Sequence, residues 1–357
     1  MHGSRSATTT GWRLACLVIT ALLQGRLAAG RAAEPGDHGS AGGEVRRLVA
    51  TLGYAPEAGD QFAAFAHGLP VERWRARLRT AAARGPHGSP SAAGVAAELA
   101  VTEEIRRKLD AIVRQVDGGS TYWNLPAVLA DRRAQCLGNC QLWYVLGNAV
   151  GLRTAAVEVS RPPEGELGEH ETHVATLIRL ADGRTRMIDT RFGIDSEPFR
   201  FAEVYRRDGA WWNRADLAGD RSLHRRVRPL DAAGIEAAIL LNIGNTYRRS
   251  GHEAEAAPIY ERALAADPDS PALHLAVAET CFRNGTWDGA DRSIRAAIEL
   301  DPQGSDGHEA LGRLRMRQNR WAEAIAAFDQ AIVLKPHSPD AITARQEALN
   351  RRGEGGP

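Results

Sequence analysis

The feature that most constrains the fold is a 34-residue repeat near the end of the chain. Each copy carries a turn residue, an alanine, a bulky residue, a second alanine and a proline at fixed offsets. A unit of this length is a pair of helices that stacks on its neighbours, so we expect an all-α solenoid here. The five sets are Gly251, Gly285 and Asn319; Ala256, Ala290 and Ala324; Tyr260, Ile294 and Phe328; Ala263, Ala297 and Ala331; and Pro268, Pro302 and Pro336.

The pattern resembles the tetratricopeptide repeat, in which small residues lie where two helices cross and proline ends the second helix. We expect units at 237–270, 271–304 and 305–338, followed by a capping helix at 339–351. Stacked repeats of this kind form a concave groove. The resemblance therefore implies a protein or peptide partner that binds in the groove.

The first thirty residues are typical of a secretory signal. Arg5 and Arg13 accompany an apolar run from Leu14 to Leu23, and the small residues of 28–30 follow it. This run is too short to cross a bilayer, which takes roughly twenty apolar residues. We therefore expect a signal peptide at 1–30, export to the periplasm or out of the cell, and no stable membrane span after cleavage. An uncleaved N-terminal membrane anchor is the alternative.

Composition narrows the function further. The chain is 43% hydrophobic and 25% charged, as in ordinary globular proteins. Its formal net charge is +1 and it has no basic block, so nucleic acid is not an expected partner. Beyond the signal, the cysteines are Cys136, Cys140 and Cys281. An odd number in an exported protein leaves at least one thiol unpaired.

Between the signal and the repeats, composition divides the chain into four parts. We expect a flexible leader at 31–43, a helical region at 44–120, an α+β core at 121–215 and a linker at 216–236. The helical region includes one long helix predicted over Ala92 to Val116, with apolar residues at helical spacing on one face.

The core should pair a helix with an antiparallel sheet. Residues 154–159 are rich in β-branched and small apolar residues, and the stretch from His173 to Leu180 also predicts a strand. Asp182 and Gly183 form a strong hairpin signal, so Arg184 to Asp189 should be the returning strand. A helix before such a sheet gives an α+β fold class.

Three residues of this core form a candidate thiol triad. Cys136 opens an apolar, helix-forming segment, where the unpaired amides and the helix dipole favour a thiolate. His173 at the start of one strand and Asp189 at the end of the next should lie side by side, as base and orienting carboxylate. Cys140 would lie one turn inside the helix, and His170 lies in the polar loop.

The spacing of these residues resembles the transglutaminase-like superfamily. Cys136 precedes Gly151 by 15 residues, His173 opens a strand, and Asp189 lies near the end of the next strand. The resemblance implies a papain- or transglutaminase-like core. It also implies catalytic roles for Cys136, His173 and Asp189.

The segment from Arg132 to Leu137 more narrowly resembles the SirB-type branch, which joins this core to tetratricopeptide repeats. The stretch Arg228-Pro229-Leu230 and the following 240–244 resemble the junction of that branch, and the likeness covers roughly 100–351. This chain departs from the branch in two places. It has Ala134-Gln135 where the branch has Gly-Asn, and Thr172-His173-Val174 where the branch has Gly-His-Phe.

Two functions remain open. The first is a cysteine enzyme that cleaves or transfers amide and peptide groups through a thioester, with the amide of Cys136 and the side chain of Gln135 or Asn124 as candidate oxyanion donors. The second is a catalytically inactive adaptor whose repeats bind a protein. No cofactor and no metal are expected. A zinc site is the alternative for Cys136, Cys140, His170 and His173, although the spacing of these four residues fits zinc sites poorly.

Overall fold

The computed structural model describes residues 40–82, 91–116, 122–161, 173–214 and 222–354. The predicted signal at 1–30, most of the leader and His170 lie outside these residues. The described chain forms two compact units. The first comprises the described residues up to 206 together with those of 213–239, and the second comprises 207–212 and the described residues from 240 onward.

The first unit begins with a helical layer that starts slightly earlier than predicted. Ser40 caps the first helix by accepting a hydrogen bond from the Gly43 amide, so the helix includes three residues assigned to the leader. The helices of this layer are α2 (Ala41–Thr51), α3 (Pro56–His67), α4 (Val71–Ala81), α5 (Ala92–Ile112) and α6 (Leu125–Asp131).

Helix α5 ends earlier than the predicted Val116. Val113 is extended, with φ −124° and ψ 120°. The next two residues form strand β1 (Arg114–Gln115), which pairs in parallel with β2 (Arg133–Ala134) just before the cysteine helix. This pairing withdraws the backbone of 113–115 from the helix.

The core sheet has seven strands in the order β6-β5-β4-β3-β9-β8-β7. The predicted hairpin is present, with β4 antiparallel to β5 and Gly183 in the turn at φ +83°. The strands are β3 (Arg153–Arg161), β4 (His173–Arg179), β5 (Thr185–Asp189), β6 (Ile194–Asp195), β7 (Tyr205–Asp208), β8 (Trp211–Arg214) and β9 (Arg226–Leu230), with the short helix α8 (Phe201–Val204) before β7.

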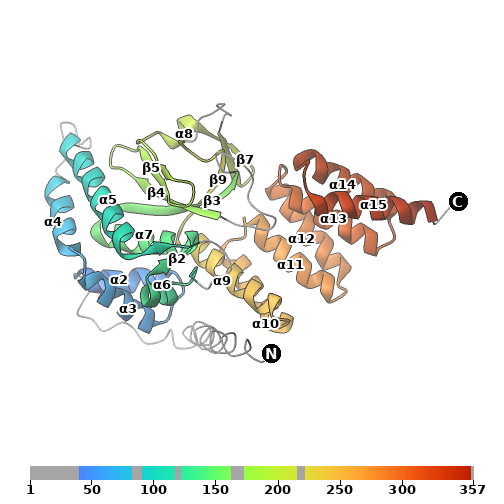
Figure 1. Ribbon diagram of the computed structural model, residues 1–357, viewed down its shortest axis with the longest axis horizontal. Helices are drawn as coiled ribbons and strands as arrows, with labels where there is room; N and C mark the ends of the chain where they lie inside the picture. The colour runs from blue at the N-terminus through green and yellow to red at the C-terminus, as the bar shows by residue number, and fades with distance from the viewer. Residues whose placement is uncertain (1–39, 83–90, 117–121, 162–172, 215–221, 355–357) are drawn as a thin grey trace, which may run out of the picture. The chain divides into compact units, whose positions relative to one another are not determined.

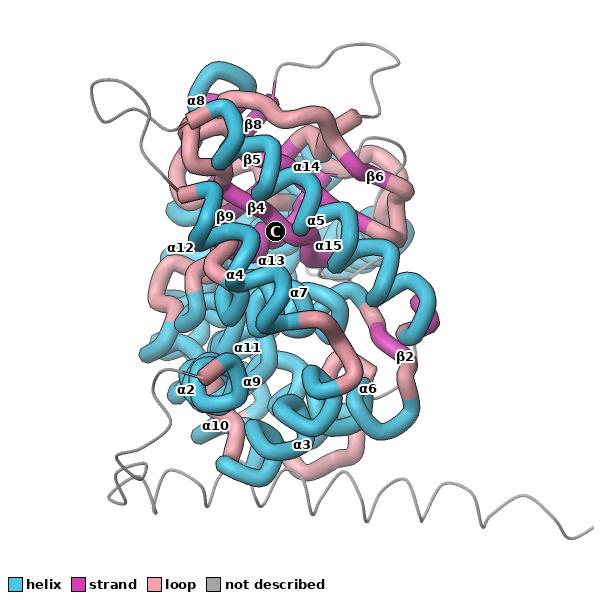
Figure 2. Tube along the Cα trace, turned by 90° about the vertical axis from the view of Figure 1, so that its left-hand side faces the viewer, coloured by secondary structure: helices cyan, strands magenta, loops and turns pink. Residues whose placement is uncertain are grey.

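Helix α7 (Cys136–Val150) packs against β3 and β4. In Figure 1 the helices α4, α5 and α7 lie beside the sheet, and in Figure 2 this helical layer lies in front of the strands. Close packing requires glycine at two points of α7. A Cβ on Gly138 would lie 2.4 Å from the backbone carbonyl oxygen of Tyr122, and a Cβ on Gly147 would lie 2.3 Å from the Thr154 methyl group. Gly151 ends the helix at φ +100°.

The stretch predicted as a linker at 216–236 contributes a central strand instead. Strand β9 pairs with β3, and Glu158 is aligned with Arg228. Two nitrogens of Arg228 donate to one Glu158 oxygen, at 2.9 and 2.7 Å, and both side chains are buried. The pairing makes a buried strand from a segment whose charged residues suggest a surface connection.

The second unit contains the helical repeats. The small and bulky repeat positions are buried, and Gly244 lies against the ring of Tyr260 as Gly312 lies against that of Phe328. Among the described residues, no helix is both long and apolar enough to cross a membrane. The helices are α9 (Ala232–Arg249), α10 (Glu253–Ala266), α11 (Pro271–Arg283), α12 (Trp287–Leu300), α13 (Ser305–Arg317), α14 (Trp321–Leu334) and α15 (Pro339–Glu354).

Candidate active site

Cys136 is the first residue of α7, as the sequence predicts. The preceding residue, Gln135, has extended backbone angles and makes no side-chain capping hydrogen bond, so the first-turn amides are not occupied by a cap. The backbone amides of Leu137 and Val174 form hydrogen bonds with the Cys136 sulfur and lower its pKa. Cys136 is partly exposed, whereas Leu137 beside it is buried. The thiol therefore lies at the positive end of a helix with access from outside.

The N-terminal helical layer fixes the start of α7. Tyr54 donates its hydroxyl to Gln141 Oε1 at 2.7 Å, and Gln141 Nε2 donates to the Trp123 carbonyl at 2.7 Å. The Tyr54 oxygen also accepts from the Leu125 amide at 3.0 Å. All of these groups are buried, so the network holds the cysteine helix to α6 and to the end of α2.

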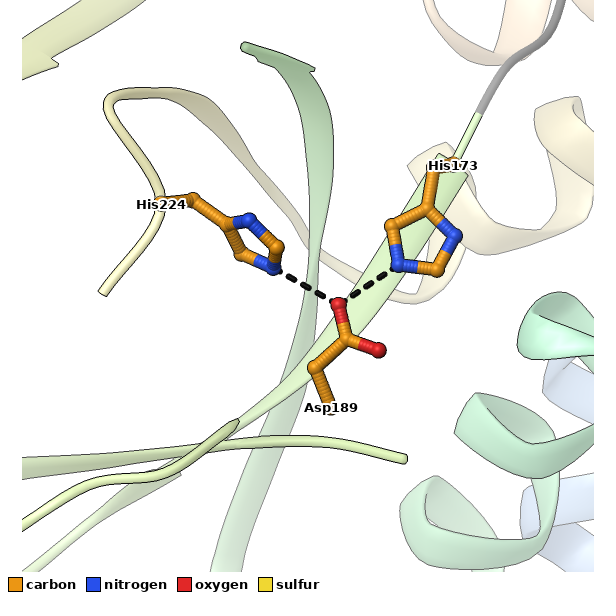
Figure 3. Close-up of side chains that lie close together, drawn as sticks. All are labelled: His173, Asp189 and His224. Atoms are coloured by element: carbon orange, nitrogen blue, oxygen red, sulfur yellow. Dashed lines mark hydrogen bonds and ion pairs between the residues drawn. The ribbon is translucent and has the colours of Figure 1, made fainter. Parts of the chain in front are cut away.

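His173 and Asp189 meet at one end of the sheet. Thr176 is aligned with Ile188 in the β4–β5 hairpin, so Asp189 falls opposite Ala175, which shares a face with His173. His173 Nε2 lies 2.5 Å from Asp189 Oδ2, and both side chains are almost fully buried (Figure 3). The hairpin thus brings together the two residues that the sequence paired.

A second histidine, His224, lies at the same carboxylate and was not among the predicted site residues. Its Nε2 lies 2.6 Å from the Asp189 Oδ2 atom that His173 also contacts, and it is fully buried (Figure 3). It arrives there because β9 begins at Arg226 beside the end of β3. No local motif in 222–226 marks this position, because it depends on strand pairing across about 65 residues of chain.

The charges of the site favour a thiolate–imidazolium pair. Burial raises the pKa of Cys136, but the hydrogen bond and charge of His173 outweigh it and leave the pKa below its ordinary value. Burial lowers the pKa of His173, yet Asp189 and Cys136 raise it to about 9. Burial likewise works against the ionised form of Asp189, but hydrogen bonds from both histidines hold the pKa of this carboxyl well below its usual range.

Cys140 has different surroundings. It is buried one turn further along α7 and accepts a hydrogen bond from Thr176 Oγ1 at 3.5 Å, while burial raises its pKa far above the ordinary value. Cys136, Cys140 and Cys281 are all free thiols. Asn124, one of the two suggested oxyanion donors, caps α6: its Oδ1 accepts from the Ala127 amide at 3.4 Å.

His173, Asp189 and His224 are also a possible set of metal ligands, with ligand atoms within 4.8 Å of one another. Two ligands of a tetrahedral zinc ion with bonds of about 2.0–2.1 Å lie roughly 3.3 Å apart. The Nε2–Oδ2 separations here are 2.5 and 2.6 Å, which are direct hydrogen-bond distances. The alternative zinc set includes His170, which lies outside the described residues; Cys136 and Cys140 do not join His173 in a set of possible metal ligands among the residues that the structure describes.

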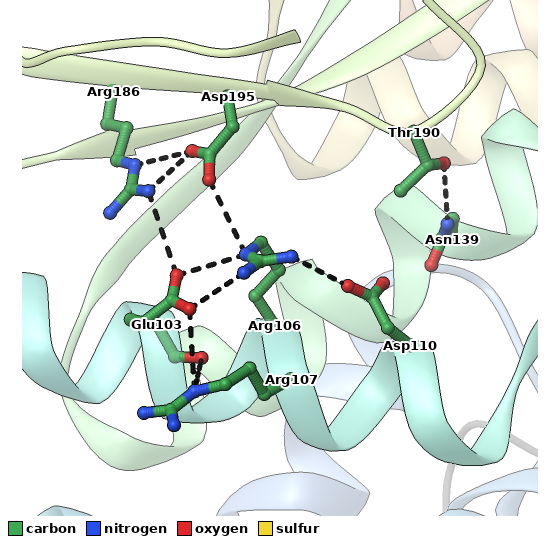
Figure 4. Close-up of polar contacts among 8 residues, drawn as sticks. All are labelled: Glu103, Arg106, Arg107, Asp110, Asn139, Arg186, Thr190 and Asp195. Carbon is green, nitrogen blue, oxygen red and sulfur yellow. Dashed lines mark hydrogen bonds and ion pairs between the residues drawn. The ribbon is translucent and has the colours of Figure 1, made fainter. Parts of the chain in front are cut away.

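A polar network next to the site ties the loop after Asp189 to α7. Asn139 Nδ2 donates to Thr190 Oγ1 at 3.1 Å (Figure 4). It also donates to Gln115 Oε1 at 3.1 Å. Glu103 and Arg106 belong to a neighbouring ion-pair cluster, and their side chains are about one-third exposed. The cluster joins α5 to β5 and β6, because Arg186 and Asp195 pair with Glu103 and Arg106, whereas the Asn139 contacts hold the loop after Asp189 in place.

Comparison with known proteins identifies the C-terminal region. A tetratricopeptide-repeat model matches residues 247–314, and a second such model matches 305–338. The C-terminal region therefore consists of tetratricopeptide repeats, as predicted. A search of curated proteins finds no match to the chain.

Solved structures that resemble part of the chain are also tetratricopeptide-repeat domains. The first such domain of Spaghetti (RPAP3), bound to an HSP90 peptide, is 23% identical with a TM-score of 0.31, over 33% of this chain and 93% of that one. The Arabidopsis OM64 domain is 19% identical with a TM-score of 0.32, over 33% and 98%. The Sgt2 domain from Aspergillus fumigatus is 20% identical with a TM-score of 0.32, over 34% and 81%.

Proposed function

We propose that the first unit is a transglutaminase-like cysteine enzyme that acts on amide or peptide bonds through a thioester. One observation carries the proposal. His173 Nε2 is hydrogen-bonded to Asp189, while His173 Nδ1 has no nitrogen or oxygen partner among the described residues. The Cys136 thiol at the start of α7 interacts with the same ring. This is the arrangement of nucleophile, base and orienting group that thiol acyl transfer requires.

In the proposed reaction the Cys136 thiolate attacks the carbonyl carbon of the amide. The carbonyl oxygen takes the negative charge near the uncapped amides at the start of α7. The C–N bond then breaks, and His173 gives its Nδ1 proton to the leaving amine or ammonia. Water or a second amine next attacks the thioester and passes a proton to His173, which releases an acid or a new amide and restores the thiolate.

The repeats supply the second half of the proposal. Tetratricopeptide repeats expose a concave surface that binds extended or helical segments of other proteins. We infer that a protein or peptide partner binds there. If the bound segment is also the substrate of Cys136, the protein is an enzyme with a recruitment domain. If it is not, the protein is an adaptor whose core is only a scaffold.

Alkylation with iodoacetamide near neutral pH tests the enzyme proposal. Cys136 should label faster than Cys281, because only Cys136 has an imidazolium partner at a helix start. The two rates are measured by mass spectrometry of the digested protein. A Cys136 rate no higher than that of Cys281 would exclude an activated thiol and leave the adaptor function.

We also infer export, with cleavage near residue 30, from the residues of the N-terminus. Arg5 and Arg13 with the short apolar run support export over a permanent anchor. N-terminal sequencing of protein recovered from the producing cell should read a start close to residue 31. Recovery of intact Met1 would contradict cleavage and support the uncleaved anchor.

A further inference from the structure

The carboxylate of Asp189 accepts four hydrogen bonds. The amides of Arg191 and Phe192 donate to Oδ1 at 2.9 and 3.3 Å. His173 and His224 approach Oδ2 from two sides, at 2.5 and 2.6 Å (Figure 3). An ionised carboxylate is an acceptor only, so each ring must present an N–H to Oδ2.

This requirement fixes the proton on both rings. His173 and His224 must each carry hydrogen on Nε2. In the neutral form of His173 the lone pair is then on Nδ1, the nitrogen left to receive the proton of Cys136. His224 likewise keeps its proton on Nε2, and its Nδ1 has no partner among the described residues. The shared oxygen thus selects the tautomer that a thiol base needs.

His224 has two contacts besides its hydrogen bond to Asp189. Its ring packs edge-on against Phe192, with centroids 5.5 Å apart. Its backbone carbonyl accepts the hydroxyl of the buried Tyr205 at 2.7 Å. The position of the His224 donor is therefore set in part by contacts other than its hydrogen bond to Asp189.

The two histidines differ in charge. Burial lowers the pKa of His224, and the charge of His173 lowers it further against the pull of Asp189. The charged groups that act on His173 are Asp189 and Cys136, and their effect has the opposite sign. At neutral pH His224 is therefore a neutral donor beside a charged His173.

We propose that His224 is a positioning residue for the Cys136–His173 pair. Its Nε2–H donates to the same Asp189 oxygen as the His173 Nε2–H, so His173 does not have that oxygen to itself. This competition orients the carboxylate. It also limits how strongly Asp189 stabilises the imidazolium form of His173, and therefore how tightly His173 holds its Nδ1 proton. The inference rests on the proposed function, since His173 must release a proton to the leaving amine. A base held too strongly by its carboxylate is a poor acid in that step.

Replacement of His224 separates this role from simple packing. His224→Phe keeps a ring against Phe192 but removes the donor, so the pKa of His173 should rise by about half to one unit. His224→Gln retains an N–H near the same place and should leave that pKa within about 0.3 units of wild type. A purely structural role predicts the reverse for His224→Phe, because a loosened site would move the pKa of His173 down toward about 6.5.

The measurement is the pH titration of histidine side chains by two-bond 1H–15N NMR, with His173 assigned through a His173→Gln variant. A rise in His224→Phe and no change in His224→Gln support the proposal, while a fall or no change in His224→Phe overturns it. The wild-type spectrum is a second test that needs no variant, since a neutral His224 carrying its proton on Nδ1 would also overturn it. The two proposals can fail separately. If the NMR results are as expected but Cys136 alkylates slowly, the enzyme proposal is contradicted and the positioning role of His224 is not.

Discussion

Replacing His173 with glutamine should slow alkylation of Cys136 by at least about tenfold near pH 6. Glutamine can still donate to Asp189, so the buried carboxylate keeps a partner while the imidazolium is lost. Without that cation, burial raises the pKa of the thiol and only the amides of Leu137 and Val174 oppose it. A thiol of ordinary pKa, about 8.5, is less than about 1% ionised near pH 6.

The pH profile distinguishes loss of the ion pair from loss of access. The wild-type rate at Cys136 should change little between about pH 6.5 and 8, because the thiolate is already formed. In His173→Gln the rate should climb about tenfold per pH unit over the same range. Cys281 in the same molecule is the internal reference and should label equally in both proteins. A wild-type profile that climbs as steeply as that of the variant would show that no ion pair forms.

Local sequence patterns predict where three residues of the candidate site lie in the fold. The Asp-Gly turn sets the register of β4 and β5, and that register alone brings His173 and Asp189 to the same edge of the sheet. The polar residues before Cys136 and the apolar residues after it mark a helix start. The repeats were predictable for a related reason, since each of their helices packs mainly on its sequence neighbours.

Features that depend on distant pairing were missed. Strand β9 contains Arg226, Arg228 and Pro229, a composition that indicates a surface linker. Arg228 is buried only because it pairs with Glu158, which lies 70 residues earlier. His224 lies two residues before this strand, so its place could not be inferred without the pairing. The early end of α5 has a similar cause, because β1 must meet β2.

Asp189→Asn should be the most destabilising of these changes. The substitution removes the buried charge that His173 and His224 share. The new amide nitrogen would face either the two rings at the Oδ2 position or the two backbone amides at the Oδ1 position, all of which are donors. Breaking a buried ion pair by removing one partner costs about 3–5 kcal/mol. For a unit of this size the melting temperature should fall by roughly 10 °C. Asp110→Asn is the matched control, since Asp110 pairs with Arg106 at the surface and should cost less than about 1 kcal/mol.

The loss of unfolding free energy in Asp189→Asn should also depend on pH in a defined direction. The pKa of Asp189 is depressed by folding, so its stabilisation is present above the ordinary pKa of about 3.9 and is lost as the pH falls below it. The pKa of His173 is raised to about 9, so its stabilisation is complete below its unfolded pKa and is lost as the pH rises through 9. The difference in unfolding free energy between wild type and variant should therefore be larger at about pH 5.5 than at about pH 9.5. Urea unfolding at both pH values measures it, and an equal or larger difference at the higher pH would mean that His173 is uncharged in the folded protein.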